Sequence, residues 1–190
     1  MIEIVDDKRV KIYDFKTSAM FKDKKLIDAG HQLSVYQMAL EQLYGLEVVD
    51  NGWIMLKYSD VQIANNKPMV GVQNKDIVKK CKTQIKKLMI KNGIDEVMAE
   101  MYYCKCEADN NFECLTELIK KQIHIQTHLK EYKITEEVKS ETLNYIKNTI
   151  IAIDELDRNN KNQWNKQPHD FFCKNLCSFH PIGCDGLLNN

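Results

Sequence analysis

The sequence predicts a mixed α/β fold, and three observations lead to this fold class. Residues 10–15 alternate in the manner of a strand, residues 31–44 carry an apolar stripe with helical spacing, and residues 52–58 are apolar on both faces. A strand that is apolar on both faces belongs inside a sheet that is covered on both sides. The order of hairpin, helix and strand therefore indicates a mixed sheet flanked by helices.

Length and composition set the outer bounds. The 190 residues suit one domain, and a hydrophobic content of 44% is enough for a core. The 27 basic and 27 acidic residues cancel, so only a local patch would attract nucleic acid. The chain has no signal peptide and no apolar run near about eighteen residues, so we expect a soluble cytoplasmic protein with no membrane contact. In that compartment the seven cysteines are expected to be thiols or metal ligands.

Residues 1–16 predict a β-hairpin with its turn at residues 6–8. One face of its second strand carries Val10, Ile12, Asp14 and Lys16, and the other carries Lys11, Tyr13 and Phe15. Asp14 and Lys16 therefore point the same way. A carboxylate and an ammonium at the end of an apolar strand can hold a divalent cation and a water that loses a proton, which is the minimum equipment for metal-assisted hydrolysis.

A loop is predicted at residues 17–30, and Gly30 and His31 are predicted to lead into a helix that stops at Gly45, a typical C-cap. Gln32 and Tyr36 lie one helical turn apart, so that an amide and a phenol can reach one polar ligand. The loop also holds three lysines that either meet phosphates or only solvate the loop: Lys22, Lys24 and Lys25.

The run Asp14-Phe15-Lys16, followed by Thr17-Ser18 and then by Gln32 and Tyr36 on the next helix, resembles the second half of the PD-(D/E)XK nuclease core in its RecB-like branch. That branch includes the exonuclease domains of bacterial recombination helicases, the CRISPR-adaptation nucleases and many phage-encoded relatives. The resemblance implies a restriction-endonuclease-like core from a phage or prokaryote. It further implies a Mg²⁺- or Mn²⁺-dependent DNA nuclease, an exonuclease that works with or without a helicase or recombination partner.

The same resemblance implies a role for each motif residue. Asp14 would ligate the metal with help from the Phe15 carbonyl, and Lys16 would orient and activate the attacking water. Gln32 and Tyr36 would position the DNA strand or support Lys16. The alternative is a catalytically inactive nuclease-fold protein that binds nucleic acid or a protein partner. A third reading is a small zinc protein in which Asp-Phe-Lys is a coincidence.

The front of the family motif departs from this pattern. The resembled family carries a further metal-binding aspartate on its first strand, and that register falls on Met1 or just before it. We therefore expect a core that begins inside its own motif, through truncation, a misplaced start codon or decay, with weak or absent activity. Glu3 shares a strand face with position 1 and either replaces the missing ligand or is only a charged residue on a strand.

A third strand is predicted at residues 52–58 after a turn at residues 50–52. Residues 60–128 are expected to form a variable helical insertion, in which residues 74–93 predict a helix with one apolar stripe. Its basic outer face is either solvated or tracks a nucleic-acid backbone, and it carries Lys79, Lys80, Lys82, Lys86, Lys87 and Lys91.

Other chemically capable residues receive plainer interpretations. His124 and His128 alternate with apolar residues, which favours surface histidines on a strand. Thr135 is predicted to cap a long helix that runs to about Asp157, with two glutamates in its first turn. We interpret four cysteines as ordinary thiols, because C-x-C without a second pair is a poor zinc signature: Cys81, Cys104, Cys106 and Cys114.

We divide the chain into a nuclease-like core, residues 1–158, and a tail packed on it, residues 159–190. Cys173, Cys177 and Cys184 crowd this tail with His180 among them, as a ligand set would. Relatives of the RecB-like branch often hold a [4Fe-4S] cluster with three C-terminal cysteines and one far upstream. Here the fourth ligand would come from His180, a different cysteine or outside. Zinc held by the four tail residues, or three unligated thiols, are the alternatives.

Overall fold

The computed structural model describes residues 1–20 and 23–156. It confirms a mixed α/β fold with a sheet of mixed strand direction. The chain divides into two units, Met1–Leu143 and a second that begins at Asn144, within the last helix. In the described part of the chain, no helix has the length and apolar character needed to cross a bilayer.

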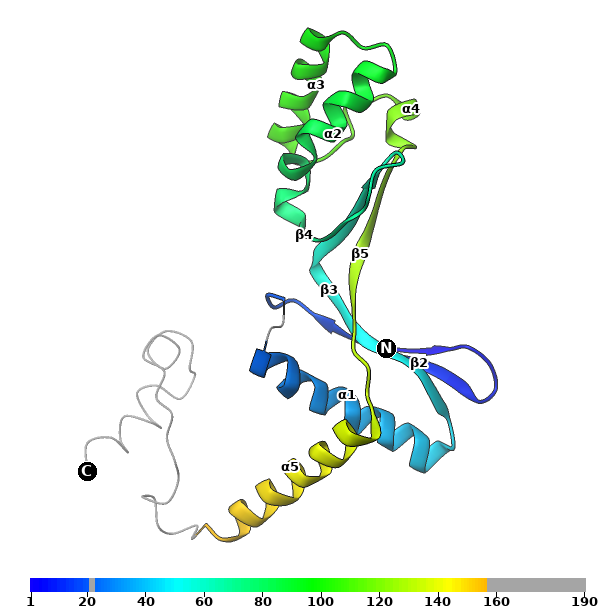
Figure 1. The fold of residues 1–190 in the computed structure, drawn as a ribbon, viewed down its shortest axis with the longest axis vertical. Helices are drawn as coiled ribbons and strands as arrows, with labels where there is room; N and C mark the ends of the chain where they lie inside the picture. The colour runs from blue at the N-terminus through cyan, green and yellow to red at the C-terminus, as the bar shows by residue number, and fades with distance from the viewer. Residues whose placement is uncertain (21–22, 157–190) are drawn as a thin grey trace, which may run out of the picture. The chain divides into compact units, whose positions relative to one another are not determined.

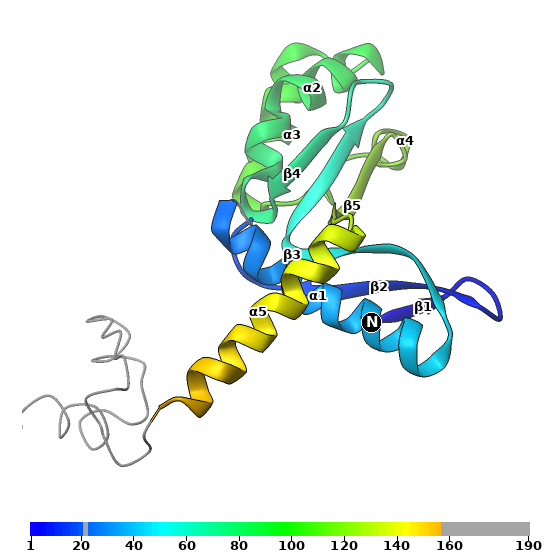
Figure 2. The same ribbon diagram turned by 60° about the horizontal axis from the view of Figure 1, so that its bottom comes forward.

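The described residues form these elements in chain order, most of them labelled in Figure 1: β1 (Ile2–Ile4), β2 (Arg9–Lys16), α1 (Asp23–Tyr44), β3 (Glu47–Ile63), β4 (Met69–Gln73), η1 (Asn74–Asp76), α2 (Ile77–Lys91), α3 (Glu96–Asp109), α4 (Glu117–Lys120), β5 (Ile123–Glu131) and α5 (Glu136–Asp154). Strand β1 pairs antiparallel with β2, β2 pairs parallel with β3, and β3 pairs antiparallel with both β4 and β5. The parallel pair requires a crossover, which α1 supplies. Figures 1 and 2 both show α1 beside the β2–β3 pair.

The predicted hairpin is confirmed, and its turn is held by the Asp6 carboxylate, which accepts from the backbone N–H groups of Lys8 at 3.0 Å and Arg9 at 2.9 Å. The predicted end of α1 is also confirmed, because Gly45 adopts φ +64°, which glycine reaches without steric cost. The predicted helix α2 and the Thr135 cap are confirmed as well. Thr135 Oγ1 accepts from the Val138 N–H at 3.3 Å, and α5 ends at Asp154.

The predicted loop at residues 17–30 is wrong over its second half, because α1 already begins at Asp23. Gly30 therefore lies inside the helix and does not start it. Because Gly30 has no side chain, the Tyr132 ring can pack against α1 at this position, where a Cβ would collide with it. The sequence predicts that Gly30 leads into the helix, whereas in the structure it permits close packing inside the helix.

The predicted turn at residues 50–52 is also wrong, because all three residues lie inside β3, which is much longer than expected. Each has a tertiary partner. Asp50 accepts from the Tyr13 hydroxyl at 2.6 Å, and Asn51 donates to Gln37 Oε1 at 2.9 Å. A Cβ on Gly52 would lie 2.6 Å from the Lys130 carbonyl oxygen of β5, so this position must be glycine for the strands to pair.

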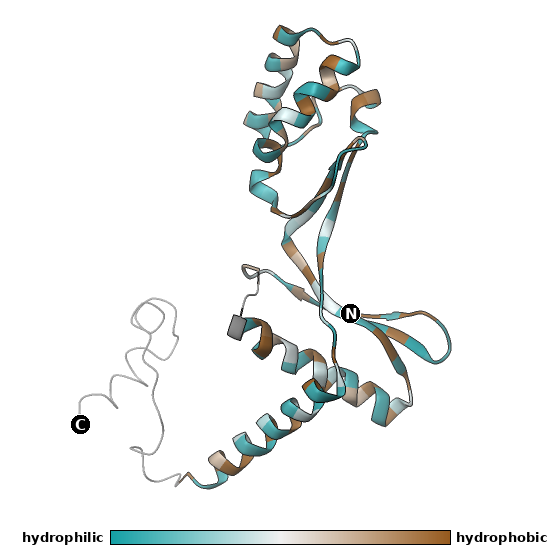
Figure 3. Ribbon diagram, in the orientation of Figure 1, coloured by the Kyte–Doolittle hydropathy of each residue, from teal (hydrophilic) through white to brown (hydrophobic). Residues whose placement is uncertain are grey.

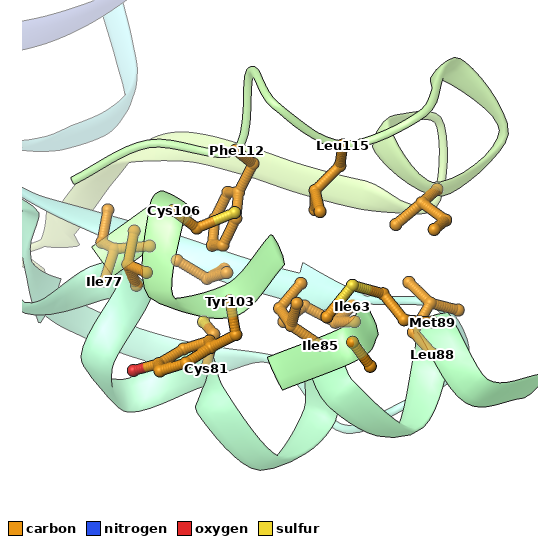
Figure 4. Packing of buried hydrophobic residues seen from close by; sticks show 14 residues of the cluster. Ile63, Ile77, Cys81, Ile85, Leu88, Met89, Tyr103, Cys106, Phe112 and Leu115 are labelled. Atoms are coloured by element: carbon orange, nitrogen blue, oxygen red, sulfur yellow. The ribbon is translucent and has the colours of Figure 1, made fainter. Parts of the chain in front are cut away.

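Among the residues that the structure describes, two hydrophobic clusters lie along β3. The first, here the site core, joins β2, α1 and the middle of β3 and consists of Ile12, Leu33, Trp53, Met55 and Tyr58. The second, here the helical core, joins the end of β3 to α2, α3 and α4 and includes Ile63, Ile85, Met89, Tyr103 and Ile119 (Figure 4). In Figure 3 both hydrophobic and hydrophilic residues lie along β3 and β5.

Candidate functional site

The carboxylate and ammonium of Asp14 and Lys16 lie at the end of β2, as the alternation of that strand predicts. Val10 and Ile12 on the same face are buried and anchor the strand. Asp14 pairs in register with Trp53 and Lys16 with Met55, and both partners are fully buried in β3. The two charged side chains are therefore carried by a rigid, paired strand and remain about one quarter exposed, 28% and 25%.

Helix α1 brings Gln32 and Tyr36 to this strand end. Lys16 Nζ donates to Gln32 Oε1 at 3.1 Å, and Gln32 Nε2 donates to the Tyr36 hydroxyl oxygen at 2.8 Å. Lys16 Nζ also lies 2.6 Å from Asp14 Oδ2. The four motif residues thus form one continuous series of polar contacts, Asp14–Lys16–Gln32–Tyr36, although they come from two elements.

The contact between Asp14 and Lys16 is an ion pair with poor directional geometry. Asp14 Oδ2 is buried and accepts no well-aligned hydrogen bond from a described residue, although the ammonium is close enough to neutralise it. The charge of the Asp14 carboxylate is therefore balanced by Lys16, but Oδ2 can still accept a hydrogen bond. An oxygen in this state can accept a further donor or cation.

Beside this cluster lies a pocket of about 400 Å³. Asp14 and Tyr36 contribute polar groups to its lining, and the rest of its lining is Met1, Ile2, Ile12, Tyr13, Ala39 and Leu40. A mainly apolar lining with a few polar groups is typical of a site that orients a ligand.

A divalent cation would find one carboxylate in the lining of this pocket, Asp14. The described residues hold no group of three or more His, Cys, Asp and Glu that could bind a metal ion. Mg²⁺ needs octahedral oxygen ligands but commonly takes only one or two from carboxylates, with water and substrate phosphates as the rest. The cluster therefore fits a cation held mainly by water and substrate, and it does not fit an all-protein metal site.

Glu3 does not supply the second carboxylate. It pairs in register with Lys11, and its Oε1 lies 3.3 Å from Lys11 Nζ. Lys11 and Asp14 point to opposite faces of β2. The hypothesis that Glu3 replaces the missing family ligand is therefore wrong, and Glu3 is a charged residue on the other strand face.

The basic face of α2 is partly neutralised. Glu100 of α3 forms an ion pair with Lys86 and lies 3.6 Å from Lys82, and these lysines lower the pKa of Glu100. Lys82 Nζ also lies 4.7 Å from the centroid of the Tyr103 ring. Two of the six predicted lysines are thus engaged within the protein, and that face offers less positive charge than the sequence alone indicates.

His128 corrects the prediction of two surface histidines. Strand β5 is confirmed, but His128 is buried, with Nδ1 2.8 Å from Asp60 Oδ1. Asp60 Oδ1 also accepts from the Gly71 N–H at 2.8 Å. The pairing of β3 with β5 shifts register between Met55 and Ser59, so that His128 lies opposite Met55 and Gln126 lies opposite Asp60. No feature of the sequence indicates that shift.

A second set of residues that sequence reasoning missed lies behind the site. Gln37 accepts from Asn51 and donates to Glu41 Oε1 at 2.6 Å, and Lys139 donates to Glu41 Oε2 at 2.7 Å. Glu136 and Glu41 together raise the pKa of Lys139. This network connects β3, α1 and the first turns of α5. The spacing of Gln37 and Glu41 by one helical turn is the only signal in the sequence.

Of the predicted thiols, Cys81, Cys104, Cys106 and Cys114 are free cysteines. Cys173, Cys177, Cys184 and His180 lie outside the described residues. Their role as iron-sulfur or zinc ligands stays a prediction. Comparisons with protein-family models, with curated proteins and with solved structures find no match.

Proposed function

We propose that the protein is a DNA nuclease of the PD-(D/E)XK type, RecB-like, and that it acts on phosphodiester bonds at the Asp14–Lys16–Gln32–Tyr36 cluster. The observation that carries the proposal is the series of contacts that links these four side chains across β2 and α1. The strand–helix–strand arrangement of β2, α1 and β3, with β2 parallel to β3, supports it further.

Lys16 is the natural contact for a phosphodiester. Its ammonium is a compact point charge with three N–H donors. One donor is used for Gln32, and a second side of the ammonium is occupied by the ion pair with Asp14. A phosphate oxygen takes the remaining donor. The apolar lining of the adjacent pocket then accommodates the sugar of a neighbouring nucleotide.

Hydrolysis needs an oriented water and stabilisation of the charge that develops on the phosphate. Lys16 would hold the water and offset that charge, while Gln32 and Tyr36 keep its ammonium in place. Asp14 would contribute one oxygen ligand to Mg²⁺ or Mn²⁺, which when bound would polarise the phosphate. With so few protein ligands, metal affinity is low and activity depends on a high metal concentration.

The test is degradation of end-labelled single- and double-stranded DNA in Mn²⁺, with Lys16→Ala and Lys11→Ala compared with the wild type. We expect Lys16→Ala to lower the rate by about 10²-fold, as loss of a charge-stabilising donor does. Lys11→Ala removes the same charge from the opposite face of β2 and is expected to leave the rate unchanged. Tyr36→Phe, which removes the contact to Gln32, is expected to lower the rate only a few-fold.

DNA binding without cleavage is the second candidate function, and the single carboxylate of the pocket favours it. Binding of the same DNA is measured in the presence of a chelator. If the wild type binds but never cuts, and Lys16→Ala weakens binding, the cluster serves recognition alone. If Lys16→Ala and Lys11→Ala behave alike in both assays, the cluster is not the site and both functions assigned to it are wrong.

A further inference from the structure

Two thiols of the helical core lie in contact. Cys106 is in α3 and Cys114 lies between α3 and α4, and their sulfur atoms are 3.2 Å apart. Both are free thiols. A disulfide bond is about 2.05 Å long, so an approach of about 1 Å would bring the sulfurs to bonding distance.

The two thiols differ in environment. Cys106 is fully buried in the helical core, which also holds Phe112 and Leu115, as Figure 4 shows. Cys114 is half-buried, and its thiol lies 3.6 Å from the Tyr102 carbonyl oxygen. Burial, with the neighbouring Cys114, raises the pKa of Cys106. Of the two, Cys114 is therefore the thiol that a reagent from solvent reaches first, and Cys106 lies buried beside it.

The segment between the two cysteines borders a pocket of about 380 Å³. Asn110, Asn111, Phe112 and Glu113, all between Cys106 and Cys114, belong to its lining, together with Lys120 of α4. Asn110 ends α3 in the left-handed conformation, with φ +48°, and so turns the chain back toward the helix. This reversal is what brings residue 114 next to residue 106.

We propose that Cys106 and Cys114 form a reversible disulfide by exchange with a low-molecular-weight disulfide such as oxidised glutathione. The Cys114 thiolate attacks one sulfur of the reagent, which forms a mixed disulfide and releases one thiol. Cys106 then attacks the Cys114 sulfur, the bond between Cys114 and the reagent breaks, and the Cys106 proton passes to the departing sulfur, which leaves as the second thiol. The protein loses two protons and two electrons, which the reagent gains as it becomes two thiols.

The bond would fasten the segment at residues 110–113 to α3 and so make one wall of the pocket rigid. The site is separate from the Asp14 cluster and doesn't depend on the nuclease proposal. We expect the reaction to be selective, so that among the seven cysteines Cys106 and Cys114 form a disulfide with each other before any other pair does.

The experiment treats the full-length protein with oxidised glutathione, blocks the remaining thiols by alkylation and maps the peptides. Trypsin cuts after Lys105 and Lys120 and leaves Cys106 and Cys114 in one peptide, apart from Cys104. We expect this peptide to be lighter by two hydrogens and to carry no alkyl group, and reduction to restore both thiols. A protease that cuts after glutamate separates the two cysteines at Glu107 and Glu113, so the bond must then join two fragments.

Cys106→Ser is the matched variant, because it removes the resolving thiol and keeps the accessible one. It is expected to stop at the mixed disulfide on Cys114. Cys104→Ser, at an exposed position of the same helix, is expected to leave the bond unchanged. If glutathione accumulates on Cys104 while the 106–120 peptide keeps two alkylatable thiols, the proposal is wrong. It is equally wrong if the bond forms only after the protein is unfolded in guanidinium.

Discussion

The two hydrophobic cores along β3 differ in how many buried polar side chains lie in or beside them. Fourteen buried residues form the helical core, and the only polar atom among their side chains besides sulfur is the Tyr103 hydroxyl. The site core has five buried residues, and the buried polar side chains Ser34, Gln37 and Asn51 lie in the same strand and helix. The core at one end of β3 is therefore almost wholly apolar, and the core at the other end is mixed.

Buried polar groups stabilise a fold only when they are hydrogen-bonded, so the polar part of the site core depends on its partners. At the site end the network of Asn51, Gln37 and Glu41 holds α1 against β3, and α1 carries Gln32 and Tyr36. The helical core depends mainly on apolar packing between the end of β3 and α2, α3 and α4.

The largest effect is expected from Ile85→Ala in the helical core. Ile85 is fully buried, and such a truncation costs about 2–5 kcal/mol because the cavity does not collapse. Ile12→Ala in the site core is expected at the lower end of that range, since Ile12 lines an open pocket that water can enter. Urea unfolding measures both. An equal or larger loss for Ile12→Ala would show that the two cores do not differ in packing.

Gly52→Ala is expected to have the next largest effect, because the new Cβ would lie 2.6 Å from the Lys130 carbonyl oxygen, a backbone atom that cannot rotate away. Overpacking of this kind costs about 1–3 kcal/mol or more. Gly45→Ala is the control, where the added Cβ has nothing within 4 Å and only the φ of +64° is strained, at about 1 kcal/mol. The free energy of unfolding decides the order, and a milder effect for Gly52→Ala would mean that β3 and β5 separate easily.

The smallest effect on the free energy of unfolding is expected for Tyr13→Phe, and it depends on pH in the alkaline range. Burial, with the hydrogen bond to Asp50, raises the pKa of Tyr13 above its ordinary value of about 10. The unfolded phenol ionises above about pH 10 while the folded one keeps its proton, so this contribution is complete below about pH 10 and is lost as pH rises further. Tyr13→Phe cannot ionise. The stability advantage of the wild type over Tyr13→Phe is therefore expected to shrink as pH rises from about 10 to about 11 in urea unfolding.

Tyr103 and Tyr132 also have raised pKa values, but both are present in the two proteins of that experiment and their contributions cancel. An advantage of the wild type that stays constant over this pH range would mean that Asp50 and burial do not hold the Tyr13 proton.

Much of the candidate site could be predicted because its signals are local. The alternation of β2 determines that Asp14 and Lys16 share a face, and one helical turn places Tyr36 beside Gln32. The contact between Lys16 and Gln32 joins two elements, and it was expected only from the family resemblance. The Glu3 hypothesis failed because strand pairing, and not distance along the chain, decides the face of Glu3.

The sequence by itself determined the hairpin, the end of α1 at Gly45, the apolar stripe of α2 and the cap of α5, because each depends on neighbours within one turn or one strand. Only the tertiary structure decided the roles of Gly30 and Gly52. Gly30 leaves room for the Tyr132 ring, and Gly52 leaves room for the Lys130 carbonyl oxygen. The same holds for the burial of His128 and for the contact of Cys106 with Cys114. In each case the partner comes from another element, and its approach is set by strand register and packing, which no local pattern encodes.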